Sequence, residues 1–195
     1  MNFLTKFVIS DTQYLKINPE CIHDDECAVC AQIDIDYVDE EKNICIKFGN
    51  KALSDFCYFF SQYEQIQKLI NNESVFDDSS NDLGFEWNQF YKGLIKDTDV
   101  LEKYHFESNS HKQIRPYFNS WLYNDKDGNV IFEITPFYPW HGESKKSNPD
   151  FITYKQFMKN YKPILKTIIP KENLIQWIAQ AKELGKIYFP EFEWK

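Results

Sequence analysis

Four side chains able to bind a metal lie close together near the N-terminus: Cys21, His23, Cys27 and Cys30. Thiolate and imidazole groups are ligands that zinc prefers, and four of them suit its tetrahedral geometry. Structural zinc sites usually draw two pairs of ligands from separate segments, whereas these four lie in one. The five cysteines of the chain also form an odd set, which argues against a disulfide framework. We therefore expect reduced thiols, no metal site and no cofactor.

The segment from Pro136 to Glu143 combines three aromatic rings with an imidazole and a carboxylate, and two prolines stiffen it. Tyrosine and tryptophan supply contact area in recognition sites at a small entropic cost. We predict that Tyr138, Trp140 and His141 help to bind a protein partner; the alternative is that the rings cap the end of the core. Acid–base catalysis by His141 with Glu133 or Glu143 is a further hypothesis, but any of the four histidines fits that loose criterion.

Other chemical signals are weaker. The run from Asp125 to Gly128 begins like a calcium-binding loop, but its glycine stands at the fourth position rather than the sixth, and no bidentate glutamate follows at the required distance. Turn formation explains the run better. The chain has six glycines and lacks phosphate-binding loops, dinucleotide-binding turns and nucleophile elbows. We expect a protein that is not an enzyme.

The charge of the chain is uneven. The net charge is −8, and residues 1–100 hold 19 acidic and 8 basic side chains, whereas residues 101–195 hold 11 and 14. An acidic chain with one arginine repels phosphate, so we expect a basic protein partner and no nucleic acid. The acidic residues predicted to contact that partner are Asp24, Asp25, Glu26, Asp36, Asp39, Glu40, Glu41, Asp77, Asp78 and Asp82.

Alternating apolar residues predict a β-hairpin over residues 31–48 with a turn at residues 39–42. A four-residue loop there would place Lys47 opposite Asp34. On this register Asp34 is neutralised by its cross-strand neighbour, whereas Asp36 keeps its charge. A second hairpin is predicted over residues 117–135.

In the second hairpin, the predicted register places Trp121 beside Phe132 and Leu122 beside Ile131. Because both faces of this hairpin are apolar, we expect it to be covered on both sides. Helical periodicity predicts helices over residues 51–71, 83–101 and 170–185, and a capping box at Thr153 opens a shorter helix.

The predicted fold class is α+β: a single domain over residues 1–195, with an antiparallel sheet built from hairpins and flanked by amphipathic helices. Its half 1–100 is acidic and its half 101–195 is rich in aromatic residues. The N-terminal apolar run is too short for a signal peptide, and no run approaches the roughly 20 apolar residues of a membrane span. We therefore expect a cytoplasmic protein without a membrane partner; the oligomeric state is open.

One segment has a familiar order of features. It consists of a Trp-Leu-Tyr strand from Trp121, the turn at 127–129, the aromatic run 132–140, Asn-Tyr-Lys-Pro at 160–163, and Ile169-Pro170 before a helix that contains Trp177. This order resembles immunity proteins of bacterial contact-dependent growth inhibition systems, which are polymorphic toxin systems.

The resemblance implies a protein with no reaction of its own that binds one toxin domain and blocks it. Many intracellular toxins act on nucleic acid and are basic at the site, so an acidic inhibitor gains association rate and specificity. An exposed strand edge that pairs with the toxin is a further hypothesis, although the sequence does not show which edge is free. The alternatives are an adaptor that binds through residues 136–143 and a small hydrolase that uses His141.

Overall fold

The computed structural model describes residues 5–20, 32–61, 63–71, 73, 82–94, 104–109, 117–140 and 150–190. Within these ranges the chain forms two four-stranded antiparallel sheets and five helices. The predicted α+β class is therefore confirmed, with two sheets where one was expected.

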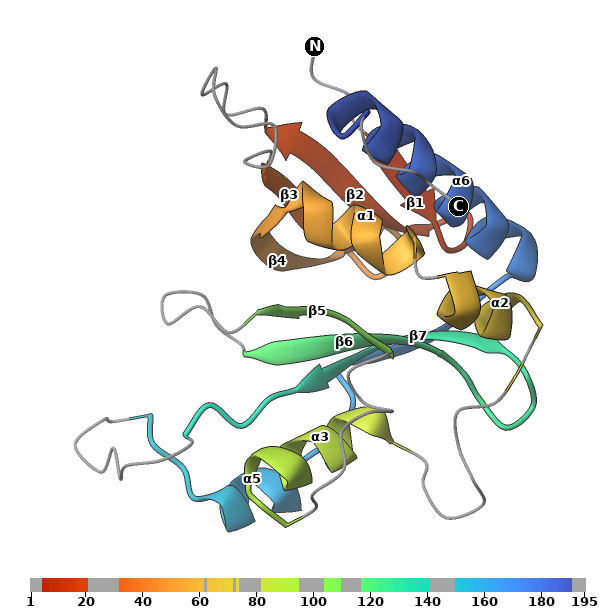
Figure 1. The fold of residues 1–195 in the computed structure, drawn as a ribbon. Coiled ribbons are helices and arrows are strands. Elements are labelled where there is room, and N and C mark those ends of the chain that lie inside the picture. The colour runs from red at the N-terminus through yellow and green to blue at the C-terminus, as the bar shows by residue number, and fades with distance from the viewer. Residues whose placement is uncertain are drawn as a thin grey trace.

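The first sheet contains strands β1 to β4 in sequence order. Helices α1 and α6 lie across one face of this sheet (Figure 1). Consecutive antiparallel strands joined by turns are the arrangement that the hairpin pattern predicts. The bounds are β1 Thr5–Val8, β2 Gln13–Glu20, β3 Gln32–Asp39, β4 Ile44–Ala52, α1 Leu53–Ser61 and α6 Lys171–Tyr188.

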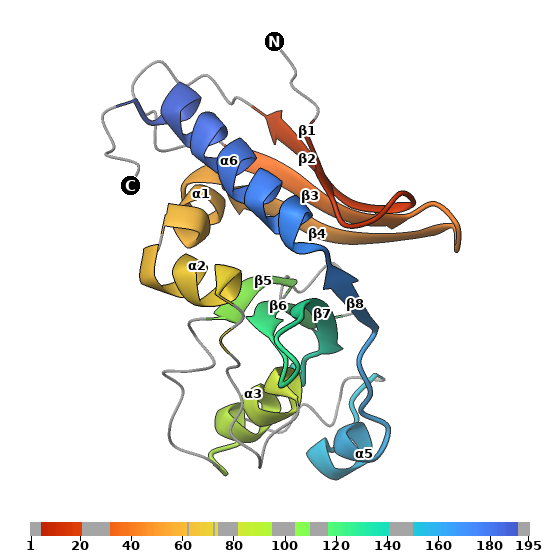
Figure 2. The ribbon, with the colours of Figure 1, turned by 90° about the vertical axis from the view of Figure 1, so that its right-hand side faces the viewer.

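The second sheet contains strands β5 to β8, again in sequence order. Its central strands β6 and β7 are buried along nearly their whole length, which confirms that this hairpin is covered on both faces. The first sheet lies on one side of it, and helices α3 and α5 lie on the other (Figure 2). The bounds are β5 His105–Asn109, β6 Phe118–Asn124, β7 Val130–Pro136, β8 Leu165–Ile169, α2 Tyr63–Ile70, α3 Leu83–Tyr91 and α5 Tyr154–Lys159.

A continuous cluster of buried apolar side chains joins the two sheets. Phe48 of the first sheet packs edge-on against Phe118 of the second, with ring centroids 5.0 Å apart. The ring of Tyr37 stacks on Phe132 at 6.3 Å. Since a fully buried side chain of this size contributes about 1.5–3 kcal/mol, this layer holds the sheets against each other.

The predicted register of the first hairpin is wrong. Near the turn the shift is two residues, so Lys47 lies opposite Asp36. A β-bulge between Ile35 and Asp36 adds one more residue, so Asp34 lies opposite Asn50. The physical reason is the turn: β3 continues through Asp39, and the turn closes at Asn43, whose φ of 53° is in the left-handed region. Asp36, and not Asp34, therefore has lysine across the strand.

The predicted register of the second hairpin is wrong by one residue. Trp121 lies opposite Glu133, and Leu122 lies opposite Phe132. The loop holds five residues because the Asp125 carboxylate accepts from the amides of Asp127 and Asn129, each at 2.9 Å. A shift of one residue changes which side chains are neighbours on each face.

The helices differ from prediction at their ends. The expected helix 51–71 is two helices, α1 and α2, and the first begins only at Leu53 because β4 continues to Ala52. The expected helix 83–101 ends at Tyr91, since Gly93 has a φ of 74° and the left-handed conformation terminates helices. The capping box at Thr153 is confirmed, and α6 runs three residues beyond Gly185 to Tyr188. Among the described residues, no helix combines the length and the apolar character needed to cross a membrane.

Candidate functional site

Two turns meet at one end of the first sheet and form what we call the hairpin tip, defined as residues 10–13 and 39–43. The Glu40 amide donates to the Thr12 carbonyl at 2.8 Å, which joins the β3–β4 turn to the β1–β2 turn. The side chains of Asp11, Glu40 and Glu41 are exposed there. In Figure 2 the two turns lie at the same end of the sheet. The tip therefore presents carboxylates from two separate loops.

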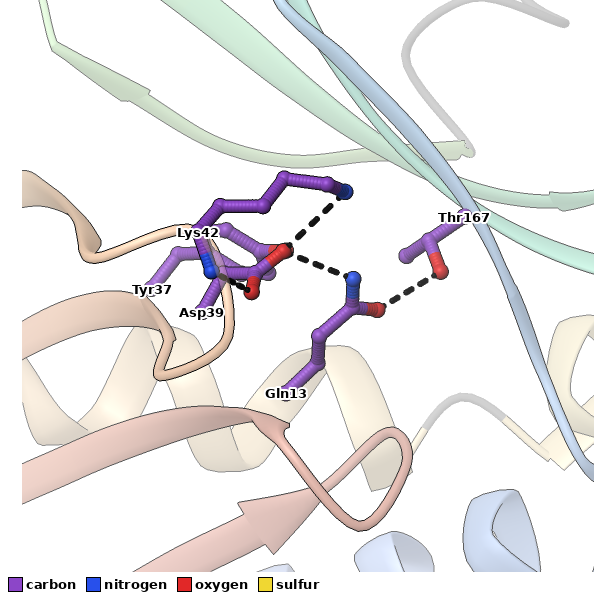
Figure 3. Close-up of polar contacts among 5 residues, drawn as sticks. All are labelled: Gln13, Tyr37, Asp39, Lys42 and Thr167. Atoms are coloured by element: carbon purple, nitrogen blue, oxygen red, sulfur yellow. Dashed lines mark hydrogen bonds and ion pairs between the residues drawn. The ribbon is translucent and has the colours of Figure 1, made fainter.

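Asp39 anchors the tip from inside and is only 1% exposed. Its carboxylate accepts from the Gln13 side-chain amide at 2.9 Å and from the Lys42 backbone amide at 2.9 Å, and it pairs with the Lys42 ammonium at 3.2 Å (Figure 3). The Lys42 backbone hydrogen bond is the main cause that lowers the pKa of this carboxyl below its ordinary value. The Asp39 side chain is thus a structural part of the tip and is not available to a partner.

Gln13 also ties the tip to the second sheet. While its amide nitrogen donates to Asp39, its side-chain carbonyl accepts from the Thr167 hydroxyl of β8 at 3.0 Å (Figure 3). A side chain that bonds at both ends loses rotamer freedom on folding, and its position becomes well defined. The tip is consequently held by both sheets.

Lysines offset part of the acidic charge that the sequence concentrates in this region. The Glu40 carboxylate lies 3.9 Å from the Lys6 ammonium, and both side chains are about half exposed. Asp36 lies between Lys16 and Lys47 on neighbouring strands. Burial raises the pKa of Asp36 above its ordinary value despite these lysines. The sheet face is therefore mixed in charge.

The tip keeps an acidic excess. It and its immediate ion-pair partners hold four carboxylates against two ammonium groups, and the exposed members include Glu40 and Glu41 as predicted. The four carboxylates are Asp11, Asp39, Glu40 and Glu41, and the two ammonium groups are Lys6 and Lys42.

The other predicted partner-binding residues are dispersed. Asp82 caps helix α3 by accepting from the Phe85 amide at 2.8 Å, and it also accepts from the Tyr161 hydroxyl at 2.7 Å. Tyr138 is 3% exposed, so it belongs to the core. Trp140 is half-buried. The remaining candidates lie outside the described residues: Asp24, Asp25, Glu26, Asp77, Asp78 and His141, together with Cys21, His23, Cys27 and Cys30.

A buried carboxylate that the sequence analysis considered only as a possible catalytic partner of His141 lies on β7. Glu133 is 1% exposed, accepts from the Tyr123 hydroxyl at 2.7 Å, and lies 3.9 Å from the Lys166 ammonium of β8. Burial raises the pKa of Glu133 from 4.5 to about 6. In the sequence, Glu133 is the one charged residue in the otherwise uncharged run 130–136. Its partners could not be predicted because the expected register of the hairpin was wrong.

Tyr161 and Thr135 join this cluster to helix α3. The Trp121 indole donates to the Thr135 hydroxyl at 2.8 Å, and the Tyr161 hydroxyl donates to Asp82. The first contact joins strands β6 and β7, and the second joins the loop after α5 to the N-cap of α3. Thr135 and Tyr161 also lie directly beside Gly84 of α3, so both residues take part in the packing of this helix on the second sheet. In the part of the chain that the structure describes, no three His, Cys, Asp or Glu side chains come together as a metal would require.

Fold and site thus define an α+β protein with a charged, well-anchored hairpin tip and a buried polar cluster. Comparison with protein-family models, with curated proteins and with solved structures finds no match for this chain.

Proposed function

We propose that this chain is an immunity protein: it binds a cognate toxin domain, in a contact-dependent growth inhibition system, and blocks the toxin by charge-complementary occlusion. The observation that carries the proposal is the hairpin tip, where exposed Asp11, Glu40 and Glu41 are held on two cross-linked turns. The partner is a basic domain, and the chain performs no reaction of its own.

The rigidity of the tip supports a binding role. A loop that is ordered before binding costs less conformational entropy when the complex forms. Hydrogen bonds of Asp39 and Gln13 hold the two turns in place. The backbone at Glu40 and Glu41 is therefore fixed, while their side chains face solvent. Complementary charge at such a surface raises the association rate and excludes wrong partners.

The sequence resemblance described above is the second support for the proposal. The segment that carries it, from Trp121 to Trp177, includes β8 and the first part of α6, and β8 holds Gln13 of the tip through Thr167. The tip and the resembling segment are therefore adjacent in the fold.

The experiment is a growth assay in bacteria that express the secreted toxin domain encoded beside this gene. Cells that co-express the wild-type chain should grow, and the toxin domain should co-purify with it. The double variant E40K/E41K should protect less well, since both substitutions place like charge against a basic partner. The matched control is E172K/E183K, which reverses two exposed carboxylates of α6.

Equal loss of protection in both double variants would contradict a role for the tip, because only the net charge would then matter. Absence of protection by the wild-type chain against its neighbouring toxin domain would contradict the proposed function as a whole. Circular dichroism of each variant must first show unchanged folding.

A further inference from the structure

An open sheet exposes unpaired backbone groups along its edge strands, and proteins usually protect such edges. In the two described sheets the edge strands are β1, β4, β5 and β8. Strands β4 and β5 pack near each other where the sheets meet. The edges at β1 and β8 are the outer ones and can be compared directly.

Side chains of helix α6 seal the β1 edge. The carbonyl of Lys6 accepts from the Gln180 side-chain amide at 3.2 Å, and the carbonyl of Val8 accepts from the Trp177 indole at 2.7 Å. These two residues are two apart, so both carbonyls point to the same side of the strand, away from β2. The outward acceptors of β1 are therefore occupied.

Among the described residues, no side chain protects the β8 edge in this way. No side chain of the described elements forms a hydrogen bond with the backbone of Leu165–Ile169, and no described strand pairs with it on its outer side. In Figure 2 it is the outermost strand of the second sheet, on the side where the hairpin tip also lies. With respect to the described part of the chain, the outward backbone groups of β8 are unpaired.

The side chains along β8 alternate in a way that suits recognition. Ile164, Lys166 and Ile168 share one face, and they are 43%, 45% and 55% exposed. Thr167 points to the other face and bonds Gln13. An added strand would meet isoleucine, lysine and isoleucine in turn along one face.

We propose that the β8 edge takes up an extended segment of a partner protein as an additional antiparallel or parallel strand. The segment alternates apolar and acidic residues, with apolar side chains beside Ile164 and Ile168 and a carboxylate beside Lys166. Backbone hydrogen bonds supply affinity in strand addition, and alternate side chains supply specificity. The Lys166 ammonium lies 3.9 Å from the buried Glu133, but its side chain is 45% exposed and can also contact an acidic neighbour. Opposite charges on adjacent strands stabilise the pair.

A second copy of this chain fits the edge less well than a partner segment. The edge is five residues long, and a stable interface needs roughly 1,000 Å² or more, which one short strand pair does not reach. Symmetric antiparallel pairing about Lys166 would also place two ammonium groups opposite each other. The edge is therefore better suited to a peptide segment than to self-association.

This inference does not depend on the proposed immunity function, because it concerns a different surface. The test uses a short capped synthetic peptide that alternates valine and glutamate, titrated into the full chain labelled with ¹⁵N. Shift changes and slowed amide exchange should appear in β8 and its neighbour β7. A peptide of the same sequence with alternate backbone nitrogens methylated should not bind, since it keeps the side chains and loses the donors.

The protein variant that tests the edge is Ile168→Lys, with Ile187→Lys as the matched control. Both isoleucines are more than half exposed, so both variants should fold, and only the first lies on β8. Lysine at position 168 removes the apolar neighbour of a peptide valine, so the first substitution should weaken peptide binding by about tenfold and the second should not.

Three results would overturn the inference: equal effects of the two substitutions, binding of the methylated peptide, or shift changes that map away from β8. Light scattering that reports a dimer in the wild type and a monomer in Ile168→Lys would also overturn it, in favour of a second copy. The E40K/E41K variant should bind the peptide like the wild type, so failure of one proposal does not affect the other.

Discussion

The side chain of Gln13 donates to the carboxylate of Asp39 at 2.9 Å, and its carbonyl accepts from Thr167 of the other sheet. One glutamine thereby connects the turns of the first sheet with the edge strand of the second. The contact is polar and lies at the margin of an aromatic core, where a hydrogen-bonded geometry fixes the relative position of the sheets better than apolar packing alone.

The first prediction concerns this anchor. Asp39→Ala removes the acceptor of the Gln13 amide and of the Lys42 backbone amide, and it leaves a cavity in the turn. We expect the melting temperature to fall by several degrees, roughly 3–8 °C, as measured by circular dichroism. Asp11→Ala, an exposed change in the adjacent turn, should leave the melting temperature nearly unchanged. Equal effects would show that Asp39 is no anchor.

The second prediction concerns Glu133. Its pKa is raised from 4.5 to about 6, so the folded state binds a proton more tightly than the unfolded state does. The stability that comes from this protonation is complete below pH 4.5 and is lost as the pH rises through about 6. Glu133→Gln lacks this titration and keeps an acceptor for the Tyr123 hydroxyl.

The free energy of unfolding should therefore change differently with pH in the two proteins. Between pH 4.5 and about pH 7.5, the free energy of unfolding of Glu133→Gln should rise by about 2 kcal/mol relative to that of the wild type. This value is the shift in the pKa of Glu133 expressed as free energy. Urea denaturation at the two pH values measures the difference. The assignment to Glu133 would be refuted if the difference in free energy of unfolding between the two proteins did not change with pH, or if it changed in favour of the wild type as the pH rises.

The third prediction concerns Gly84 in the first turn of α3. Replacement of a helical glycine by alanine usually stabilises by about 1 kcal/mol. A methyl group at Gly84 would instead collide with the Thr135 side chain and lie 2.6 Å from the Tyr161 hydroxyl. Because both belong to packed elements, we expect Gly84→Ala to lower the free energy of unfolding by about 1–3 kcal/mol.

Gly93→Ala is the companion variant for that measurement. A methyl group there meets nothing within 4 Å, but the φ of 74° is unfavourable for alanine. The expected cost is about 1 kcal/mol and comes from the backbone alone. A gain in stability for Gly84→Ala would mean that α3 packs less closely on β7 than described.

The sequence predicted elements more reliably than registers. Local spacing of residues located the β6–β7 hairpin, the capping box at Thr153 and helix α6, because each depends on residues close in sequence. Both hairpin registers were wrong, since the position of the first turn and the length of the second depend on side-chain hydrogen bonds such as those of Asp39 and Asp125, which a pattern of apolar residues does not contain.

Only the part of the candidate site that depends on local sequence could be predicted. Exposure of Glu40 and Glu41 follows from their place in a turn, and it was predicted. Burial of Asp39 depends on Gln13 and Thr167, which are distant in sequence, and the partners of Glu133 depend on a register that the pattern misplaced. Tertiary contacts of this kind leave no local signal.

The salt dependence of toxin binding tests the central claim most directly. Affinity for the neighbouring toxin domain would be measured by calorimetry at low and high salt for the wild type, E40K/E41K and the control E172K/E183K. The proposal that the tip contributes complementary charge predicts that binding by the wild type and by the control weakens strongly with salt. The tip variant should bind about tenfold more weakly at low salt and depend less on salt. Identical affinity and salt dependence in all three proteins would contradict the account.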